Sequence, residues 1–282
     1  MPSRQSKIEK VARVALKVSE QTFPAFAHPK SPRKYRLPQM VACVVMKTWL
    51  RQDYRGFVDF LIASPPLRAA LGLESIPHYS TLSYVFKNRF SEEAMNKMIC
   101  EVLRQAGIKS SAAAVDSTGF QINPASAYFI GRKGQPHRAW AKLGITVLLP
   151  SFLIAHAHAN WFPVHDRTDF VKVVEPAAQR VRLTDLYADA GYDAEWIHEW
   201  CRDERGIRSW IKPNRVKRDG TANGHWRNLM ATQMAQDYGR RWGVETVFSV
   251  IKRRWGATTV GRTRATQKRE TLLKAVVYSI DR

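Results

Sequence analysis

Two aspartates stand alone in short apolar stretches, where a carboxylate is costly to bury. Asp116 lies in Ala-Ala-Ala-Val-Asp-Ser-Thr-Gly-Phe, and Asp189 lies in Leu-Tyr-Ala-Asp-Ala-Gly-Tyr, just before a glycine that permits close approach of backbone or ligand. An ionised carboxylate is stable in such surroundings only with a partner or a metal ion. Each aspartate taken singly fits a turn cap equally well. Together they favour a site for divalent cations, which prefer clustered oxygen ligands.

A third carboxylate, Glu245, lies in a segment whose spacing predicts a helix. At about 100° per residue, the helix places four side chains within an arc of roughly 60°. They are Tyr238, Arg241, Glu245 and Lys252. The adjoining arc is apolar and fits a helix that lies against a sheet, with Glu245 at the sheet-facing border. An ordinary amphipathic helix with an Arg241–Glu245 ion pair explains the segment as well, and its two glycines weaken the helix prediction.

These carboxylates and their basic neighbours suit phosphodiester chemistry. Cleavage without a covalent enzyme intermediate suits two divalent metal ions about 4 Å apart, one activating the nucleophile and one stabilising the leaving oxygen. We therefore predict that Asp116, Asp189 and Glu245 are catalytic and bind two ions of Mg2+ or Mn2+. In the same prediction Arg241 and Lys252 hold DNA phosphates beside the ions, and Tyr238 hydrogen-bonds or stacks.

The charge of the chain points to a polyanionic partner. Lys and Arg number 45 against 24 Asp and Glu, which gives a formal net charge of +21, and the excess runs through both halves of the sequence. A protein this basic attracts phosphate backbones, so double-stranded DNA is the predicted partner. Charge alone fits a ribosome-associated or simply soluble basic protein too, because charge governs association rather than fold.

Composition predicts a globular protein that neither leaves the cell nor crosses a membrane. Hydrophobic residues make up 45% of the chain, and three isolated cysteines form no zinc-finger or disulfide pattern. Residues 1–10 lack the apolar core of a secretory signal. The longest apolar run, residues 143–155, is short and is broken by Pro150.

The elements that would carry the candidate residues fall into two parts. Residues 1–106 predict only helices, over 8–22, 38–53, 56–71 and 91–105, and form the predicted N-terminal domain. After a polar hinge at 107–111 the apolar runs become strand-like, and residues 107–282 form the predicted catalytic domain. Its order is strands 111–122, 142–149 and 151–158, helix 169–180, strand 184–188, helix 194–205, strand 207–212, and a long C-terminal helix, then a final helix at 270–280.

Two further clusters have structural and functional interpretations. A loop at 77–79 followed by a helix at 80–89 fits the second helix of a helix-turn-helix, although a plain packing helix fits equally. We predict that Lys87 and Arg89 of this helix contact DNA. His156 and His158 fit one face of a strand better than a zinc site with His165.

The motif Tyr-x2-Arg-x3-Glu-x6-Lys, which Tyr238, Arg241, Glu245 and Lys252 complete, resembles the hallmark of the DDE transposases of insertion-sequence families four and five. Both aspartate contexts and the segment His165-Asp166 are similar to segments of the same superfamily. The resemblance covers roughly residues 107–265. It implies a ribonuclease-H-like mixed sheet flanked by helices, preceded by an all-helical N-terminal domain. The short stretch between 212 and 238 resembles family five more than family four, whose members carry a large β insertion there.

The resemblance implies a bacterial insertion-sequence transposase. Its metal ions would drive water onto the phosphodiester at each element end, and the freed 3′ hydroxyl would attack target DNA at the same site. The enzyme would act as a homodimer or higher oligomer on DNA, in the cytoplasm at the nucleoid. A ribonuclease-H-like nuclease or resolvase would use similar acids without strand joining, and a domesticated DNA-binding protein would carry them as relics. The spacing of the motif argues against the first alternative, and the intact trio against the second.

Overall fold

The hinge expected near residue 107 coincides with a division of the chain into two units. The computed structural model describes residues 5–28, 30, 33–122, 140–161, 164–214, 216–234, 236 and 238–282. Unit 1 comprises residues 1–105 together with 272–282, and unit 2 comprises residues 106–271. This division groups residues 272–282 with unit 1, whereas the predicted catalytic domain, residues 107–282, includes them. The assignment of a separate function to each part stays a prediction.

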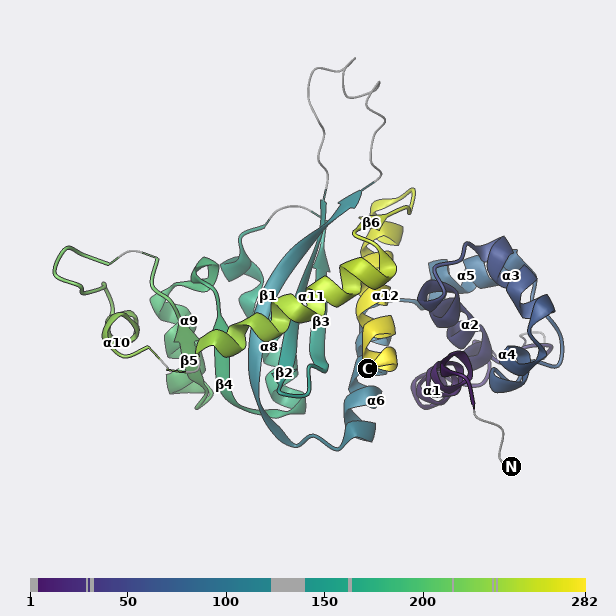
Figure 1. Cartoon of the computed structure of the whole chain (residues 1–282), viewed down its shortest axis with the longest axis horizontal. Coiled ribbons are helices and arrows are strands. Elements are labelled where there is room, and N and C mark those ends of the chain that lie inside the picture. The colour runs from purple at the N-terminus through teal and green to yellow at the C-terminus, as the bar shows by residue number, and fades with distance from the viewer. Residues whose placement is uncertain are drawn as a thin grey trace, which may run out of the picture. The chain divides into compact units, whose positions relative to one another are not determined.

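Unit 1 consists of helices, as predicted (Figure 1). They are α1 (Lys7–Thr22), α2 (Leu37–Trp49), α3 (Tyr54–Ala63), α4 (Pro65–Ala70), α5 (Tyr79–Arg89) and α6 (Glu92–Ala106). The apolar α2 is buried from Leu37 to Met46 and packs against α1 and α5. The single helix predicted at 56–71 is two helices, because Pro65 restricts Ser64 to a non-helical conformation.

Unit 2 is built on a mixed sheet. Its strands are β1 (Ser110–Ile122), β2 (Trp140–Leu149), β3 (Ile154–Asn160), β4 (Arg182–Ala188) and β5 (Arg208–Ile211), in the order β3-β2-β1-β4-β5. β1, β2 and β3 pair antiparallel, whereas β4 runs parallel to both β1 and β5. The short β6 (Thr258–Thr259) pairs with the end of β1. Three antiparallel strands followed by two parallel ones, joined through helices, form a ribonuclease-H-like sheet, so the predicted fold class is confirmed.

Helices cover both faces of this sheet. Successive side chains of a strand point to opposite faces. On β1, the Thr118 hydroxyl accepts a hydrogen bond from Lys252 of α11 (Trp242–Trp255), whereas the neighbouring Ser117 donates one to Asp166 of α8 (Asp166–Arg180). The helices α11 and α8 therefore lie on opposite faces, as Figure 1 shows. The middle of β1, at Ser117 and Thr118, therefore receives polar groups from both helices.

The remaining elements follow the predicted order with several local differences. The third strand begins at Ile154 and not at Ser151, because residues 151–153 form a turn in which Phe152 has φ 60°. The helix predicted at 194–205 is α9 (Glu195–Glu199) continued by the π-helical η2 (Trp200–Glu204). The other elements are η1 (Ala190–Tyr192), α10 (His225–Thr232), η3 (Tyr238–Arg241) and α12 (Arg264–Asp281). Among the described residues, none of the helices combines the length and the apolar run that a bilayer crossing needs.

Candidate active site

Asp116 and Asp189 lie side by side where the parallel pairing of β1 and β4 ends, and β1 continues past Asp116 in its pairing with β2. Val115 of β1 stands opposite Ala188 of β4. Asp116 follows Val115, and Asp189 follows Ala188. Both aspartates therefore lie just beyond the last paired residues of β1 and β4. The structure thus brings two of the three predicted catalytic residues together on rigid neighbouring strands.

Backbone N–H groups orient both carboxylates. Asp116 Oδ1 accepts a hydrogen bond of 2.7 Å from the Ser117 N–H, and Asp189 Oδ1 accepts one of 2.8 Å from the Gly191 N–H. Asp189 therefore caps η1, which is the turn-cap role that the sequence left open, and lies beside Asp116 as well. A Cβ at Gly191 would lie only 2.9 Å from Asp189 Oδ1, so a larger residue there would displace the carboxylate from its present position.

The surroundings of Asp116 oppose its ionisation. Burial raises the pKa of Asp116 to about 7, the Ser117 N–H lowers it, the charges of Asp189 and Asp166 raise it, and the Arg241 guanidinium lowers it. A carboxyl group placed beside two others is ionised at lower cost when a cation joins the cluster. The donor chemistry of this place therefore fits a divalent metal ion.

Asp166 is a third aspartate at this place, and the sequence did not single it out as a site residue. It is the first residue of α8, and its carboxylate accepts a hydrogen bond from the Ser117 hydroxyl. Lys142 Nζ of β2 lies 2.8 Å from Asp166 Oδ1. Acidic residues are common in the first turn of a helix, because they interact favourably with the helix dipole. An aspartate at this position therefore does not by itself indicate a functional residue. The similarity of the His165-Asp166 segment to the transposase superfamily was the one available signal.

The face predicted to carry Tyr238, Arg241, Glu245 and Lys252 is divided between two elements. Tyr238 and Arg241 lie in η3, and α11 begins only at Trp242, so the single helix predicted through this segment is wrong. Gly239 disfavours an α-helix at that point. The Tyr238 hydroxyl donates a hydrogen bond of 2.8 Å to the carbonyl of Ala188, the residue before Asp189.

Glu245 is half-exposed on α11, one residue after the buried Val244. Its side chain is 49% exposed, and its carboxylate Oε1 forms an ion pair of 2.6 Å with Arg241 Nη1. The helix buries the apolar residues that the sequence predicted, which are Val244, Val247, Phe248, Ile251 and Trp255. Arg241 is 18% exposed, and its charge also acts on Asp116. Glu245 is therefore connected to the aspartates through Arg241.

Lys252, two turns further along α11, reaches β1 beside Asp116. Its Nζ donates a hydrogen bond of 2.6 Å to Thr118 Oγ1 and lies 5.6 Å from the centre of the Phe120 ring. Burial lowers the pKa of Lys252, and the charge of Asp116 opposes that shift. An ammonium group thus lies next to the buried carboxylate.

The three predicted ligands are not assembled into one metal site. In the described part of the chain, no three His, Cys, Asp or Glu side chains come close enough to hold a single ion. Asp116 and Asp189 fit such an ion through their placement and through the like charges that surround Asp116. Glu245 does not complete the set in this structure, because its carboxylate binds Arg241.

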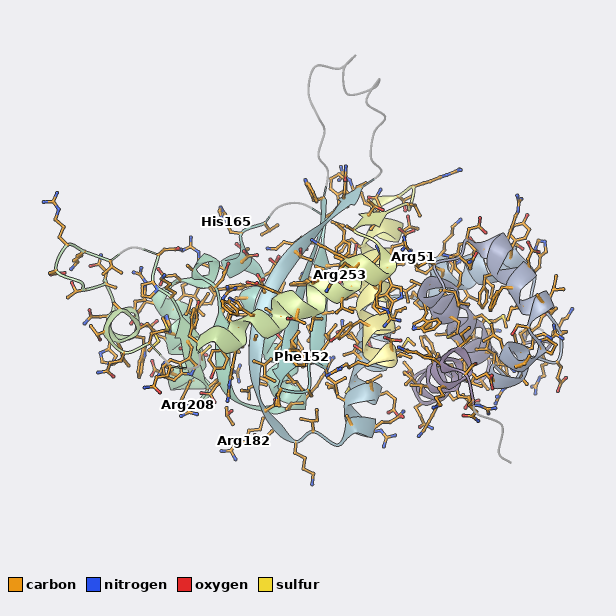
Figure 2. The ribbon with its side chains drawn as sticks, viewed as in Figure 1. Arg51, Phe152, His165, Arg182, Arg208 and Arg253 are labelled. Atoms are coloured by element: carbon orange, nitrogen blue, oxygen red, sulfur yellow. The ribbon has the colours of Figure 1, made fainter. Side chains whose placement is uncertain are left out.

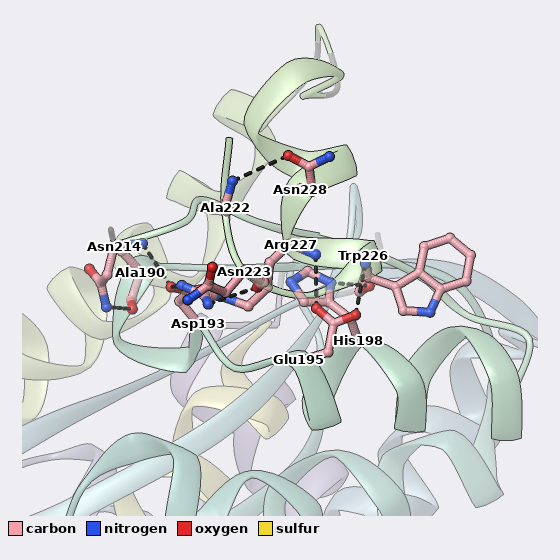
Figure 3. A network of polar contacts seen from close by, with 11 residues as sticks. Ala190, Asp193, Glu195, His198, Asn214, Ala222, Asn223, Trp226, Arg227 and Asn228 are labelled. Atoms are coloured by element: carbon pink, nitrogen blue, oxygen red, sulfur yellow. Dashed lines mark hydrogen bonds and ion pairs between the residues drawn. The ribbon is translucent and has the colours of Figure 1, made fainter. Parts of the chain in front are cut away.

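A buried ion pair that the sequence did not reveal secures the chain after Asp189 (Figure 3). Arg227 Nε and Nη2 each lie 2.6 Å from a carboxylate oxygen of Asp193, whose side chain is 2% exposed. Glu195 accepts hydrogen bonds of 2.8 Å and 3.0 Å from the backbone N–H groups of Trp226 and Arg227, in the first turn of α10. These contacts join α10 to the segment that follows β4.

The basic excess is exposed on both units. Figure 2 shows Arg182, Arg208 and Arg253 on the surface of unit 2. In unit 1, the predicted DNA contact Lys87 borders a groove of about 470 Å³, whereas Arg89 is half-buried and does not line it. The other residues of this groove are Asp53, Tyr54, Arg55, Tyr79, Ser80, Ser83 and Tyr84.

Comparison with known proteins places these residues in a family context. The sequence profile described as "Transposase DDE domain" matches residues 108–280. No curated protein matches the chain in sequence. A solved structure described as the piggyBac transposase synaptic complex with hairpin DNA is similar, with 7% sequence identity and a TM-score of 0.47 over 98% of this chain and 72% of that chain. The matched residues 108–280 include every residue predicted to be catalytic.

Proposed function

We propose that this chain, which belongs to the transposase DDE domain family, cuts DNA at the ends of an insertion sequence and joins the freed ends to target DNA. The reaction is hydrolysis of a phosphodiester followed by transesterification, both at one site. Within the superfamily we place the chain nearer to insertion-sequence family five than to family four. The short stretch between β5 and Tyr238 supports that placement.

The observation that carries this proposal is the meeting of acids and bases where the parallel pairing of β1 and β4 ends. Asp116 and Asp189 follow the last paired residues of the two strands, and the charges of Arg241 and Lys252 both interact with that of Asp116. Oxygen ligands bordered by cations fit a phosphodiester bound through metal ions, because the carboxylates bind the ions and the cations bind phosphate oxygens.

Asp116, Asp189 and Glu245 are the proposed metal ligands. Divalent ions, Mg2+ or Mn2+, would supply activation of the nucleophile and stabilisation of the leaving oxygen. The two aspartates offer oxygens from adjacent places on the paired strands β1 and β4. Glu245 joins them when it exchanges its Arg241 partner for the metal site, and Arg241 then becomes available to a DNA phosphate.

Lys252 and Tyr238 have different proposed roles beside these ligands. An ammonium has three N–H donors, so Lys252 can donate to Thr118 and to a phosphate oxygen at once. Tyr238 donates to the Ala188 carbonyl, which supports a role in positioning the backbone that leads to Asp189.

In unit 1, we propose that the groove beside Lys87 contacts the DNA backbone. Lys87 is exposed, and Arg55 lies with its guanidinium 4.8 Å from the centre of the Tyr79 ring. Tyr84 is 58% exposed. Cations interleaved with aromatic rings and hydroxyl groups are typical of surfaces that bind nucleic acid. Because an element has two ends, two or more copies of the chain are proposed to act together on DNA.

A cleavage assay tests the proposed function. Cloned element-end DNA is incubated with Mg2+ or Mn2+ and wild-type protein, or with Asp116→Ala, Asp189→Ala or Glu245→Gln. Each variant should lose cleavage, while Glu199→Gln, an exposed carboxylate on α9, should retain it. Cleavage that persists in all three variants would refute the site. Wild-type cleavage without strand joining would instead favour a ribonuclease-H-like nuclease or resolvase.

A further inference from the structure

Asp166 lies close to both aspartates of the proposed metal site: its charge acts on Asp116, and its Oδ2 faces the loop that follows Asp189. We propose that Asp166 is a positioning residue of that site: Lys142 and Ser117 hold its carboxylate, which adds a third negative charge and strengthens the binding of a divalent cation at Asp116 and Asp189. The inference rests on the proposed function, because that function places the cation there.

The two oxygens of Asp166 face different neighbours. Oδ1 accepts from the Ser117 hydroxyl and lies 2.8 Å from Lys142 Nζ. Oδ2 faces the chain after β4, where it lies 3.2 Å from the position that a Cβ of Gly191 would occupy. Asp189 Oδ1 lies 2.9 Å from the same position. One oxygen of Asp166 is thus anchored to the sheet, and the other faces the Asp189 loop.

The carboxylate of Asp166 is anchored by Lys142 of β2, which is largely buried. Lys142 is 12% exposed, donates a hydrogen bond of 2.5 Å to the Val164 carbonyl, and lies 3.7 Å from Asp169 Oδ2 as well. Its ammonium therefore joins two acids of the first turns of α8. A side chain with this many short contacts keeps Asp166 in one orientation, which a mobile surface acid would not have.

The negative charge of Asp166 acts on two neighbouring groups of the site. It acts on Asp116, and together with Asp116 and Asp189 it acts on the hydroxyl of Tyr192. Tyr192 is buried, and its ring lies edge-on at 6.0 Å from Phe170 of α8. The chain after Asp189 is thus packed against the helix that carries Asp166, so the two carboxylates keep their separation. Three fixed negative charges attract a divalent cation more strongly than the two charges of Asp116 and Asp189 alone.

The affinity of the full chain for Mn2+ in the absence of DNA tests this inference. Binding is measured by electron paramagnetic resonance or calorimetry for the wild type, Asp166→Asn and Asp166→Glu. Asp166→Asn keeps acceptors for Ser117 and Lys142 but loses the charge, and should weaken Mn2+ binding about 10-fold, as supporting residues of metal sites do. Asp166→Glu should recover part of this loss. Glu175→Gln removes an ion-paired acid from the same helix and should bind as the wild type does.

The outcomes separate this inference from the proposed function. Wild-type affinity in Asp166→Asn, with weaker binding in Asp116→Asn and Asp189→Asn, would overturn the role of Asp166 and leave the metal site standing. Wild-type affinity in all three would overturn the proposed metal site itself. If Asp166→Asn does not fold, Ser117→Ala decides the question. This variant removes one anchor of Asp166, so weaker binding supports the inference and unchanged binding overturns it.

Discussion

Replacing Asp116 with asparagine should stabilise the metal-free protein at neutral and alkaline pH. Burial, with the charges of Asp189 and Asp166, raises the pKa of Asp116 from 3.8 to about 7. The folded chain therefore holds this proton more tightly than the unfolded chain, and the resulting stability is fully present below about pH 4 and lost as the pH rises through 7. At 1.36 kcal/mol per pKa unit, the raised pKa lowers the free energy of unfolding, relative to its value below pH 4, by about 4 kcal/mol at pH 8 and about 2 kcal/mol at pH 5.5. Asparagine has no such dependence.

Urea unfolding in EDTA at several pH values measures this difference. Relative to Asp116→Asn, the wild type should lose about 2 kcal/mol of unfolding free energy between pH 5.5 and pH 8. Glu199→Gln, which removes an exposed carboxylate of unit 2, should follow the wild type. Addition of Mg2+ at pH 8 should stabilise the wild type and not Asp116→Asn, because the ion binds the ionised carboxylate of the folded chain. A gap between wild type and variant that stays constant with pH would refute the reasoning.

Three further changes have defined outcomes. Arg227→Met leaves the Asp193 carboxylate buried without its ion-pair partner and should lower the unfolding free energy by about 3–5 kcal/mol in urea, while the double variant with Asp193→Asn should recover part of that loss; equal losses in both would contradict this account. Lys252→Met should reduce the slope of log K for DNA binding against log salt concentration by about one, as the loss of one phosphate contact does, and an unchanged slope would count against that contact. Gly191→Ala places a Cβ 2.9 Å from Asp189 Oδ1 and should weaken Mn2+ binding without DNA, so wild-type affinity would show that the loop can shift at no cost.

The sequence predicted the sheet of unit 2 because each strand carries its own local signal. Apolar runs bounded by turns gave the strands, and a lone acid in an apolar run marked Asp116 and Asp189. Their neighbourhood depends on the order of the strands, and the family resemblance implied only the ribonuclease-H-like fold in which that order occurs. Local patterns alone do not show that β1 and β4 are parallel neighbours. The break of the predicted helix at Ser64 was visible in the following proline, which our spacing argument overrode.

What the sequence missed depends on contacts between distant segments. Asp166 gains its place from Ser117 and Lys142, which lie far from it along the chain. The ion pair between Asp193 and Arg227 joins two elements in the same way. The arc of a helix predicted that Tyr238, Arg241, Glu245 and Lys252 share one face, but it did not reveal that the α-helix begins after Arg241. The spacing of residues along the chain predicts which face of a helix or strand each one occupies. Tertiary packing decides which charged groups come into contact.

The place of Glu245 links the proposed binding of metal to that of DNA. Arg241 forms an ion pair with Glu245, and its charge acts on Asp116. Glu245 is half-exposed, and an ion pair of this kind contributes at most about 1 kcal/mol. A metal ion that takes the Glu245 carboxylate therefore releases Arg241 at small cost, and a DNA phosphate that takes Arg241 releases Glu245 for the ion. Each ligand frees the group that the other needs, so under the proposed mechanism the two should bind with positive coupling of equal size in both directions.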